Sequence, residues 1–304
     1  MRVAITGSSG LIGAALAREL RSTGHEVVRL VRRAPSSADE AAWDPGSGTV
    51  DEAGLRGVHA VVHLAGEPIG GGRWTPAHKR RIRDSRVDGT RVIATALTGM
   101  RGGSQDGPQA LICGSAIGYY GSDRGDEPLT EESGSGSGFL AGVVREWEAA
   151  AEPARAAGLR VVHVRTGIVQ SAKGGALALQ LPLFKLGLGG RLGSGRQWMS
   201  WITLDDIVGI FIHAIVTPDL EGILNGTAPE PVRNAEFTQA LGRVLGRPAF
   251  LPVPKLGPAA LLGREGAQET ALASQRVLPA RTEATGYRFH HRTVEPALRH
   301  VLDR

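Results

Sequence analysis

Short apolar runs alternate with amphipathic stretches along the first two-thirds of the chain. The apolar runs predict strands at residues 3–6, 26–31, 60–64, 110–114 and 160–165. The amphipathic stretches predict helices at residues 11–21, 76–97 and 140–157. Nearly continuous apolar strands that alternate with helices are typical of a parallel sheet covered on both faces. The pattern therefore predicts an α/β fold built on a doubly wound parallel sheet of the Rossmann type.

The pattern changes after about residue 170, where glycine clusters interrupt the chain. Thr203, with Asp206 three residues later, predicts the start of a helix that runs to about residue 216. A strand is expected at 222–225, and helices at 237–245 and 294–302. We therefore expect a core at residues 1–170 and a mixed α/β region at 171–304. Part of that region completes the core, and part forms a smaller C-terminal lobe of the kind that holds a substrate.

Three segments read as linkers because they are rich in Gly, Pro, Ser and acidic residues. They lie at residues 34–48, 99–108 and 121–138. The last of them is expected to be a mobile loop over a functional site.

Composition narrows the classes of protein. The formal charge is +5, but only four of the 35 basic residues are lysines, and the arginines are spread along the chain. This favours a solvated surface over a nucleic-acid site. The single cysteine, Cys113, excludes an internal disulfide and is expected to be buried at a strand end. Histidine spacing fits no zinc motif. Because no apolar stretch approaches the ~20 residues that span a bilayer, we expect a cytoplasmic protein with neither membrane nor nucleic-acid partners.

A glycine turn follows the first predicted strand directly. Gly7 suits a tight turn, Gly10 allows close approach of a phosphate, and Gly13 allows the next helix to pack on the strand. The helix N-terminus supplies free N–H groups and the positive end of its dipole. The turn therefore predicts a site for the pyrophosphate of a dinucleotide. The expected contacts are Gly7, Ser9, Gly10, Leu11, Ile12 and Gly13.

The end of the second strand indicates which dinucleotide is bound. An NAD site usually has Asp or Glu about 20 residues after the glycines, whereas this chain has Arg32 and Arg33 there and no acid before Asp39. A planar guanidinium suits a 2′-phosphate. We therefore predict NADP(H), with Arg32 as the main clamp. The alternative is that both arginines are ordinary solvated charges.

Further motifs resemble the extended short-chain dehydrogenase/reductase family, and more narrowly its "epimerase family" oxidoreductase branch. They are Leu-Ala-Gly-Glu-Pro-Ile at 64–69, Arg-Trp-Thr at 73–75, Ser-Arg at 85–86, Ser-Ala-Ile-Gly-Tyr-Tyr-Gly at 115–121, the glycine-rich stretch 187–198, and Ser-Gln-Arg-Val-Leu-Pro at 274–279. The resemblance covers essentially the whole chain and implies a Rossmann fold that binds NADP(H). Further cofactor contacts that these motifs suggest are Leu64, Ala65, Gly66, Glu67, Arg86 and Arg165.

The catalytic pair that the family generally uses is missing. Family members carry Tyr-x-x-x-Lys on a helix, where the tyrosine exchanges a proton with the substrate while hydride moves to or from the nicotinamide. None of the three tyrosines has a lysine four residues later. The corresponding helix begins with Phe139, and Val143 takes the place of the lysine. Neither side chain can do the chemistry, so any catalysis needs other groups.

The remaining catalytic candidates are Ser115, Tyr119, Tyr120 and Glu67. Ser115 could bond a substrate carbonyl or only cap its strand, and one of the two tyrosines could replace the missing acid while the other packs. Glu67 could bind ribose, act as a base or cap a turn.

The two arginines Arg86 and Arg165 also leave alternatives open. They could bind an anionic substrate or the cofactor phosphates, or could form structural bridges to Asp84 or Glu131.

Two functions fit these features. The first is an NADP(H)-dependent oxidoreductase, or an epimerase-like enzyme, that acts on a small carbonyl or sugar-like substrate. The second is a non-catalytic redox sensor that holds NADP(H) and signals through the second lobe. The sequence leaves the oligomeric state open, with a homodimer as one option.

Overall fold

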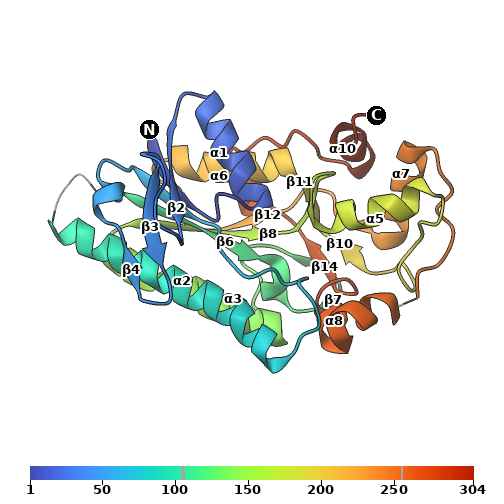
Figure 1. Cartoon of the computed structure of the whole chain (residues 1–304). Helices are drawn as coiled ribbons and strands as arrows, with labels where there is room; N and C mark the ends of the chain where they lie inside the picture. The colour runs from blue at the N-terminus through green and yellow to red at the C-terminus, as the bar shows by residue number, and fades with distance from the viewer. Residues whose placement is uncertain (104–106, 255) are drawn as a thin grey trace.

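The core of the protein is one large sheet (Figure 1). The computed structural model describes residues 1–103, 107–254 and 256–304. The sheet has eight strands in the order β12-β8-β6-β5-β1-β2-β3-β4, parallel except for the β3–β4 pair. This confirms the predicted Rossmann-type fold. The strands are β1 (Arg2–Thr6), β2 (Glu26–Val31), β3 (Glu40–Asp44), β4 (Thr49–Val50), β5 (Ala60–His63), β6 (Ala110–Ala116), β8 (Arg160–Thr166) and β12 (Gly222–Gly226).

Helices cover both faces of the sheet because its strands are apolar on both sides. From β1, Val3 and Ile5 pack in the cluster that holds α1 (Leu11–Ser22) and α6 (Leu204–Val216). Ala4 packs on the opposite face, in the cluster with α2 (Pro76–Gly103) and α4 (Glu152–Ala156). The strand order reverses between β1 and β5, and in open α/β sheets ligands bind at the carboxyl ends of the strands at such a point.

A second group of elements lies beside the sheet, on the right in Figure 1. Its helices are α5 (Gly175–Lys185), α7 (Asn234–Leu245), α8 (Leu256–Glu269) and α10 (Val294–Val301), with α9 (Ala280–Ala284) against β12. Short strand pairs join it to the core: β7 (Asp123–Leu129) with β14 (Ser274–Val277), β9 (Ile168–Gln170) with β11 (Trp201–Thr203), and β10 (Trp198–Met199) with β13 (Val232–Arg233). The 3-10 turns are η1 (Ala53–Leu55) and η2 (Ile117–Tyr120).

Several boundaries differ from the sequence prediction. The helix expected at 140–157 is two helices, α3 (Phe139–Ala149) and α4, with Pro153 near the start of the second. The linker 34–48 contains β3, and the linker 121–138 contains β7. The start of the linker 99–108 belongs to α2, while residues 104–106 lie outside the described part of the chain. The cap of α6 is confirmed, because the Thr203 hydroxyl accepts a hydrogen bond from the Asp206 N–H at 3.2 Å.

Candidate functional site

The glycine turn between β1 and α1 has no room for side chains at two positions. Gly7 has φ +64°, and a Cβ there would lie 2.8 Å from the backbone of Leu64 and Ala65. A Cβ on Gly13 would lie 2.2 Å from the Gly7 carbonyl oxygen. No side chain caps the N-terminus of α1 at Gly10. The backbone N–H groups there are open to an anion, so the turn fits a pyrophosphate.

Thr6, the last residue of β1, holds the neighbouring strand end in place. Its hydroxyl accepts hydrogen bonds from the N–H groups of Leu64 at 3.0 Å and Ala65 at 3.2 Å. These two bonds use both lone pairs of the hydroxyl oxygen. The hydroxyl therefore donates its own hydrogen bond to His63 Nδ1, 2.8 Å away. Burial lowers the pKa of His63 to about 4 and keeps the ring neutral. Sequence reasoning missed this pair, although Thr6 and His63 end adjacent strands.

The two arginines after β2 have different surroundings. Arg33 donates to both carboxylate oxygens of Glu40, at 2.9 and 2.6 Å, and holds the pKa of that carboxyl at about 2. The Glu40 side chain is fully covered, so it offers no acid to a ribose. Arg32 is exposed and has no hydrogen bond or ion pair to any described residue. Both arginines line a cavity of about 400 Å³ with Trp43.

Arg86 on α2 supports the loop that follows β5. Arg86 donates from Nη1 to the carbonyl oxygens of Glu67 and Ile82, both at 3.0 Å, and burial lowers the pKa of its guanidinium to about 10. A Cβ on Gly66 would lie 3.3 Å from the Arg86 Cζ atom. The Glu67 carboxylate lies 3.3 Å from Arg81 Nε. Arg86 therefore supports the backbone of this loop and makes no bridge to Asp84.

A polar cluster joins the ends of β6 and β8. The Ser115 hydroxyl donates to Glu148 Oε1 at 2.7 Å. Arg165 binds the same carboxylate through two hydrogen bonds, both 2.8 Å long. Both charged side chains are largely covered, at 4% and 12% exposure. Arg165 therefore forms a structural ion pair, as one alternative predicted, but its partner is Glu148 and not Asp84 or Glu131.

The two adjacent tyrosines divide into a packed residue and a more open one. Tyr120 is fully buried, and its hydroxyl lies 2.9 Å from the Thr130 carbonyl and 2.8 Å from Asn225 Oδ1. A substrate has no access to it, so the structure does not support Tyr120 as an acid. Tyr119 is half-buried, and its ring centroid lies 3.3 Å from the Arg165 Cζ atom. Its hydroxyl has no hydrogen-bond partner among the described residues.

Comparison with known proteins identifies the family. Residues 3–225 match the model of the NAD dependent epimerase/dehydratase family. The chain belongs to this family. Residues 253–301 match a domain of unknown function, DUF1731.

Three relatives show how far the similarity extends. The chain is 46% identical to the epimerase family protein MT2273 of Mycobacterium tuberculosis, over 99% of this chain and 98% of that protein. The crystal structure of human epimerase family protein SDR39U1 with NADPH has a TM-score of 0.89 and 36% identity, and each chain is covered completely. A nucleoside-diphosphate sugar epimerase from Corynebacterium glutamicum has a TM-score of 0.80 and 40% identity, over 99% of this chain and 58% of that one.

The place of the usual epimerase-family Tyr and Lys is filled by apolar packing. The Phe139 ring packs edge-on against Trp74 at 5.3 Å, with Lys79 Nζ 4.4 Å from the ring centroid. Val143 is buried. The Glu269 carboxylate on α8 accepts hydrogen bonds from the backbone N–H groups of Phe139 and Leu140. Sequence reasoning missed Glu269, which is 130 residues from Phe139.

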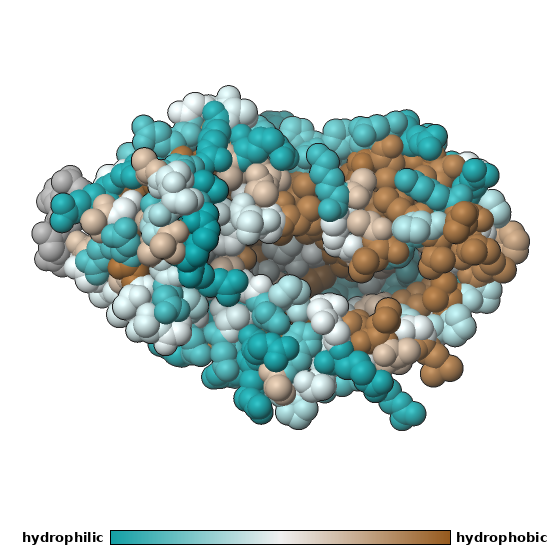
Figure 2. Space-filling model, viewed as in Figure 1, coloured by the Kyte–Doolittle hydropathy of each residue, from teal (hydrophilic) through white to brown (hydrophobic). Residues whose placement is uncertain are grey.

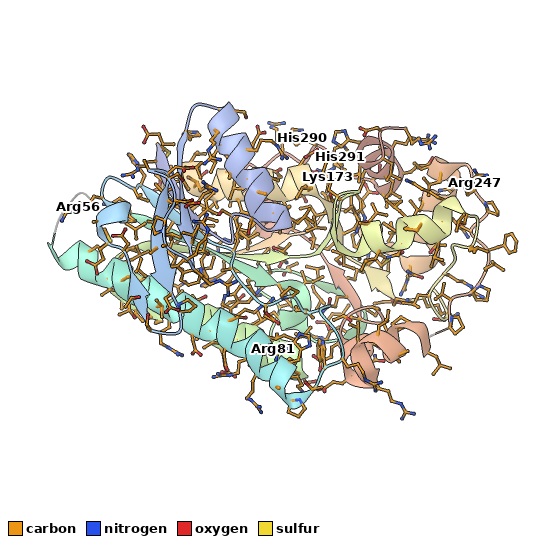
Figure 3. All side chains as sticks on the ribbon, viewed as in Figure 1. Arg56, Arg81, Lys173, Arg247, His290 and His291 are labelled. Atoms are coloured by element: carbon orange, nitrogen blue, oxygen red, sulfur yellow. The ribbon has the colours of Figure 1, made fainter. Side chains whose placement is uncertain are left out.

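A further cation lies close to the glycine turn. The segment before α5 packs on the start of α1, since a Cβ on Gly174 would lie 3.4 Å from Leu11 Cδ1. Figure 3 labels Lys173 on this segment, between α1 and α5. Its ammonium has no partner in the part of the chain that the structure describes. Figure 2 shows a hollow between α1 and α5 on one side and α2 and α8 on the other. Sequence analysis did not single out Lys173 as a cofactor contact.

Other sequence expectations concern residues outside this hollow. Cys113 is fully buried as predicted, and burial raises the pKa of its thiol. Among the described residues, no group of three or more His, Cys, Asp or Glu side chains could hold a metal ion. No helix in the same residues is long and apolar enough to cross a membrane.

Proposed function

We propose that this protein binds NADP(H) and transfers hydride between it and a small carbonyl or sugar-like substrate. The observation that carries the cofactor assignment is the contrast at the end of β2. Arg32 has no partner among the described residues. The next two acids along the chain are already paired, Asp39 with Arg29 and Glu40 with Arg33, and the Glu40 carboxylate is fully covered. The human relative crystallised with NADPH supports the same choice.

The residues that would hold the cofactor lie along one edge of the sheet. Ser9 to Gly13 would receive the pyrophosphate on the start of α1, and Arg32 would bind the 2′-phosphate. Leu64 to Glu67 would pass beside the cofactor, with Arg86 holding that loop from behind. In this proposal Arg33 acts indirectly, by keeping the Glu40 carboxylate away from the ribose.

Tyr119 is the best-placed proton donor among the candidates. Bound NADPH supplies the hydride, and the substrate oxygen must receive a proton. Arg165 lies against the Tyr119 ring, and Glu148 fixes that guanidinium with two hydrogen bonds. This pair would position Tyr119 and place a cation beside it, a task that lysine has in the usual epimerase-family pair. Ser115, which shares Glu148, lies on the same strand edge and could contact the substrate oxygen.

The second candidate function is a redox sensor that binds NADP(H) without turnover. Phe139 and Val143 favour it, because they replace both residues of the usual pair, Phe139 packing half-buried against Trp74 and Val143 being buried. Either proposal includes a cytoplasmic location and no nucleic-acid partner. A homodimer is compatible with both proposed functions.

Stopped-flow mixing separates the two functions. The protein with bound NADPH is mixed with a panel of aldehydes, keto acids, quinones and nucleotide sugars, and NADPH absorbance is followed. Oxidation by one compound class, lost in Tyr119→Phe and retained in Tyr120→Phe, supports the enzyme. The same loss in both variants would reject Tyr119 as the specific donor. Tight NADPH binding with no oxidation across the panel favours the sensor.

A further inference from the structure

Large apolar side chains are exposed on part of the group of elements beside the sheet, which we call the second lobe. Eight of the ten exposed large hydrophobic residues found among the described residues lie there: Leu179, Leu183, Leu186, Leu188, Phe250, Leu251, Leu256 and Leu261. On α5, Leu177, Leu181 and Phe184 are buried. Leu179, Leu183 and the C-cap residue Leu186 form a second stripe that faces solvent. A helix that is apolar on both sides needs a second partner surface.

Two of the segments that carry these residues, 187–193 and 248–253, are neighbours. The Val253 N–H donates to the Arg191 carbonyl at 2.8 Å, and the Gly193 N–H donates to the Val253 carbonyl at 2.9 Å. A Cβ on Gly187 would lie 3.3 Å from Pro248. We call the eight exposed side chains together the apolar face. Figure 2 shows apolar residues gathered at this end of the molecule, beside the hollow.

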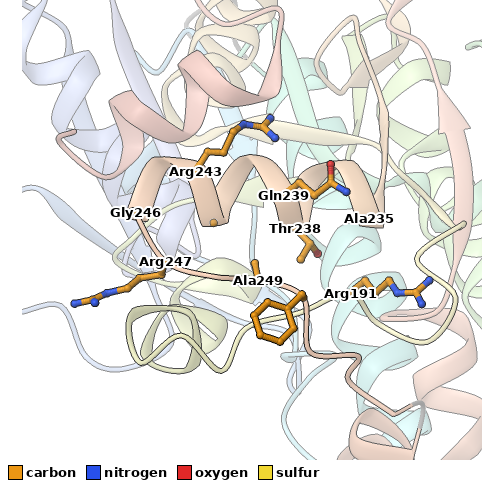
Figure 4. Close-up of a pocket in the computed structure, with 10 residues that line it drawn as sticks. Arg191, Ala235, Thr238, Gln239, Arg243, Gly246, Arg247 and Ala249 are labelled. Atoms are coloured by element: carbon orange, nitrogen blue, oxygen red, sulfur yellow. The ribbon is translucent and has the colours of Figure 1, made fainter.

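The two chain segments that carry the apolar face hold cations and no acids, while Glu236 and Glu265 lie directly beside the second segment. Residues 174–204 and 237–264 contain no Asp or Glu, but contain Lys185, Arg191, Arg196, Arg243, Arg247, Lys255 and Arg264. Arg243 pairs with Glu295, whereas Lys185, Arg247 and Arg264 have no ion pair to any described residue. Figure 4 shows Arg191, Arg243 and Arg247 around a pocket of about 650 Å³ under α7, and Phe250 also lines it. Lys255 lies outside the described residues.

We propose that the apolar face docks on the surface of an anionic lipid bilayer. Leucines and a phenylalanine on segments whose charged residues are all basic suit the boundary between acyl chains and negative headgroups. A second copy of the chain fits less well, because a two-fold contact would bring these cations against their own copies. This proposal departs from the expectation that the protein has no membrane partner. That expectation rested on the lack of an apolar stretch long enough to span a bilayer, and a contact with the membrane surface needs no such stretch.

Vesicle flotation tests the proposal with the full chain and without any substrate. The probes are phosphatidylcholine vesicles with and without phosphatidylglycerol, at low and high salt. Wild type is expected to bind the anionic vesicles and to lose much of that binding at high salt. The double variant Leu179→Glu/Leu186→Glu is expected to reduce binding more than about tenfold. These side chains are 82% and 72% exposed, so their replacement leaves the core intact.

Matched variants separate this face from general surface effects. Val216→Glu places the same charge on an exposed apolar residue at the end of α6 and is expected to leave binding unchanged. Arg247→Gln is expected to lower binding about fivefold. Arg56 is labelled at the opposite end of the molecule in Figure 3, and the variant Arg56→Gln is expected to leave vesicle binding unchanged.

Two results would overturn the proposal. One is an absence of binding to anionic vesicles, or equal binding by wild type and the double leucine variant. The other is concentration-dependent self-association in analytical ultracentrifugation that the double variant abolishes, without vesicle binding. That result would assign the face to a second copy. Neither result bears on the cofactor assignment, because no nucleotide is used.

Discussion

Arg32 is the residue that separates the two nicotinamide cofactors in the proposed site. Its guanidinium is exposed and unpaired among the described residues, so its hydrogen bonds are available to a 2′-phosphate. Losing one such charge-assisted contact costs roughly 1.5–3 kcal/mol. Arg32→Ala is therefore expected to weaken NADPH binding about tenfold to a hundredfold and to leave NADH binding nearly unchanged. Calorimetric titration with both nucleotides measures this, and an equal loss for both would reject the clamp.

Two buried histidines predict a pH dependence of stability. Burial lowers the pKa of His63 and of His163 to about 4, from an ordinary value of 6.5. The unfolded chain takes up these protons as the pH falls below 6.5, while the folded chain resists until about 4. Stability from these groups is thus present above 6.5 and is lost progressively between 6.5 and 4, by up to roughly 3 kcal/mol for each histidine.

Denaturant unfolding across that pH window measures the effect. His163→Leu is expected to remove less than about half of the histidine-dependent slope, because His63 contributes as much and burial also lowers the pKa of His213. A slope unchanged from that of the parent would show that His163 is protonated at the same pH in the folded and unfolded chains.

At the residue scale, the sequence predicted contacts that depend on neighbours in the chain. Gly7 and Gly13 were identifiable because a tight turn between a strand and a helix requires them at that spacing, and the structure leaves no room for a Cβ at either. The bond from Ser115 to Glu148 crosses 33 residues, and no local pattern specifies it. Arg33 is paired and Arg32 is not because only Arg33 contacts Glu40. The Glu40 side chain is covered because of its place in the sheet, which the neighbouring sequence does not specify.

Helix α3 depends on a cap supplied by another helix. The Glu269 carboxylate accepts hydrogen bonds from the Phe139 N–H at 2.8 Å and the Leu140 N–H at 2.7 Å, where the helix dipole also favours a negative charge. Glu269→Ala is expected to destabilise the protein by about 1–2 kcal/mol. Glu265→Ala on the same helix removes only a surface ion pair with Lys79 and is expected to cost less than about 1 kcal/mol. Thermal unfolding of both variants makes the comparison, and equal Tm shifts would contradict a capping role.

Elements with a strong hydrophobic period were predicted well, and those whose partners are distant were not. β2 begins and ends at the predicted residues because its apolar run is bounded by polar ones. β3 was missed because Glu40 and Asp44 lie at its ends, and the Glu40 carboxylate is buried only through its pairing with Arg33 and Arg29. α5 was missed because Pro182 lies inside it and its leucines follow no single stripe.

Contacts between the middle of the chain and its C-terminal part join the second lobe to the core. β14, near the C-terminus, pairs in parallel with β7, and the Gln275 amide at its centre donates to the Ile117 carbonyl at 3.0 Å. The Ser200 hydroxyl donates to the Gln275 carbonyl and accepts from the Val277 N–H. The second lobe thus reaches directly behind the Tyr119–Tyr120 turn. No sequence pattern predicts this, since each partner lies in a segment that reads as a loop.

The C-terminal segment is fixed to the core by one buried carboxylate. Asp206 is fully covered and accepts hydrogen bonds from the Tyr287 hydroxyl at 3.1 Å and from the N–H groups of His290 at 2.8 Å and His291 at 3.1 Å. Its neighbour Asp205 is exposed and contacts only His300 among the described residues. The difference between the two acids arises from a segment about 80 residues away, so the sequence around them does not predict it.

Replacing each acid by its amide tests how the last segment is held. Asp206→Asn leaves one buried N–H group facing an amide donor, which costs about 1–3 kcal/mol. Hydrogen exchange should then accelerate across residues 287–304 before it does so in the sheet, because the lost bonds join that segment to α6. Asp205→Asn changes only a surface pair and should leave the exchange pattern intact. Uniform acceleration throughout the sheet in Asp206→Asn would mean that the segment and the core unfold as one unit.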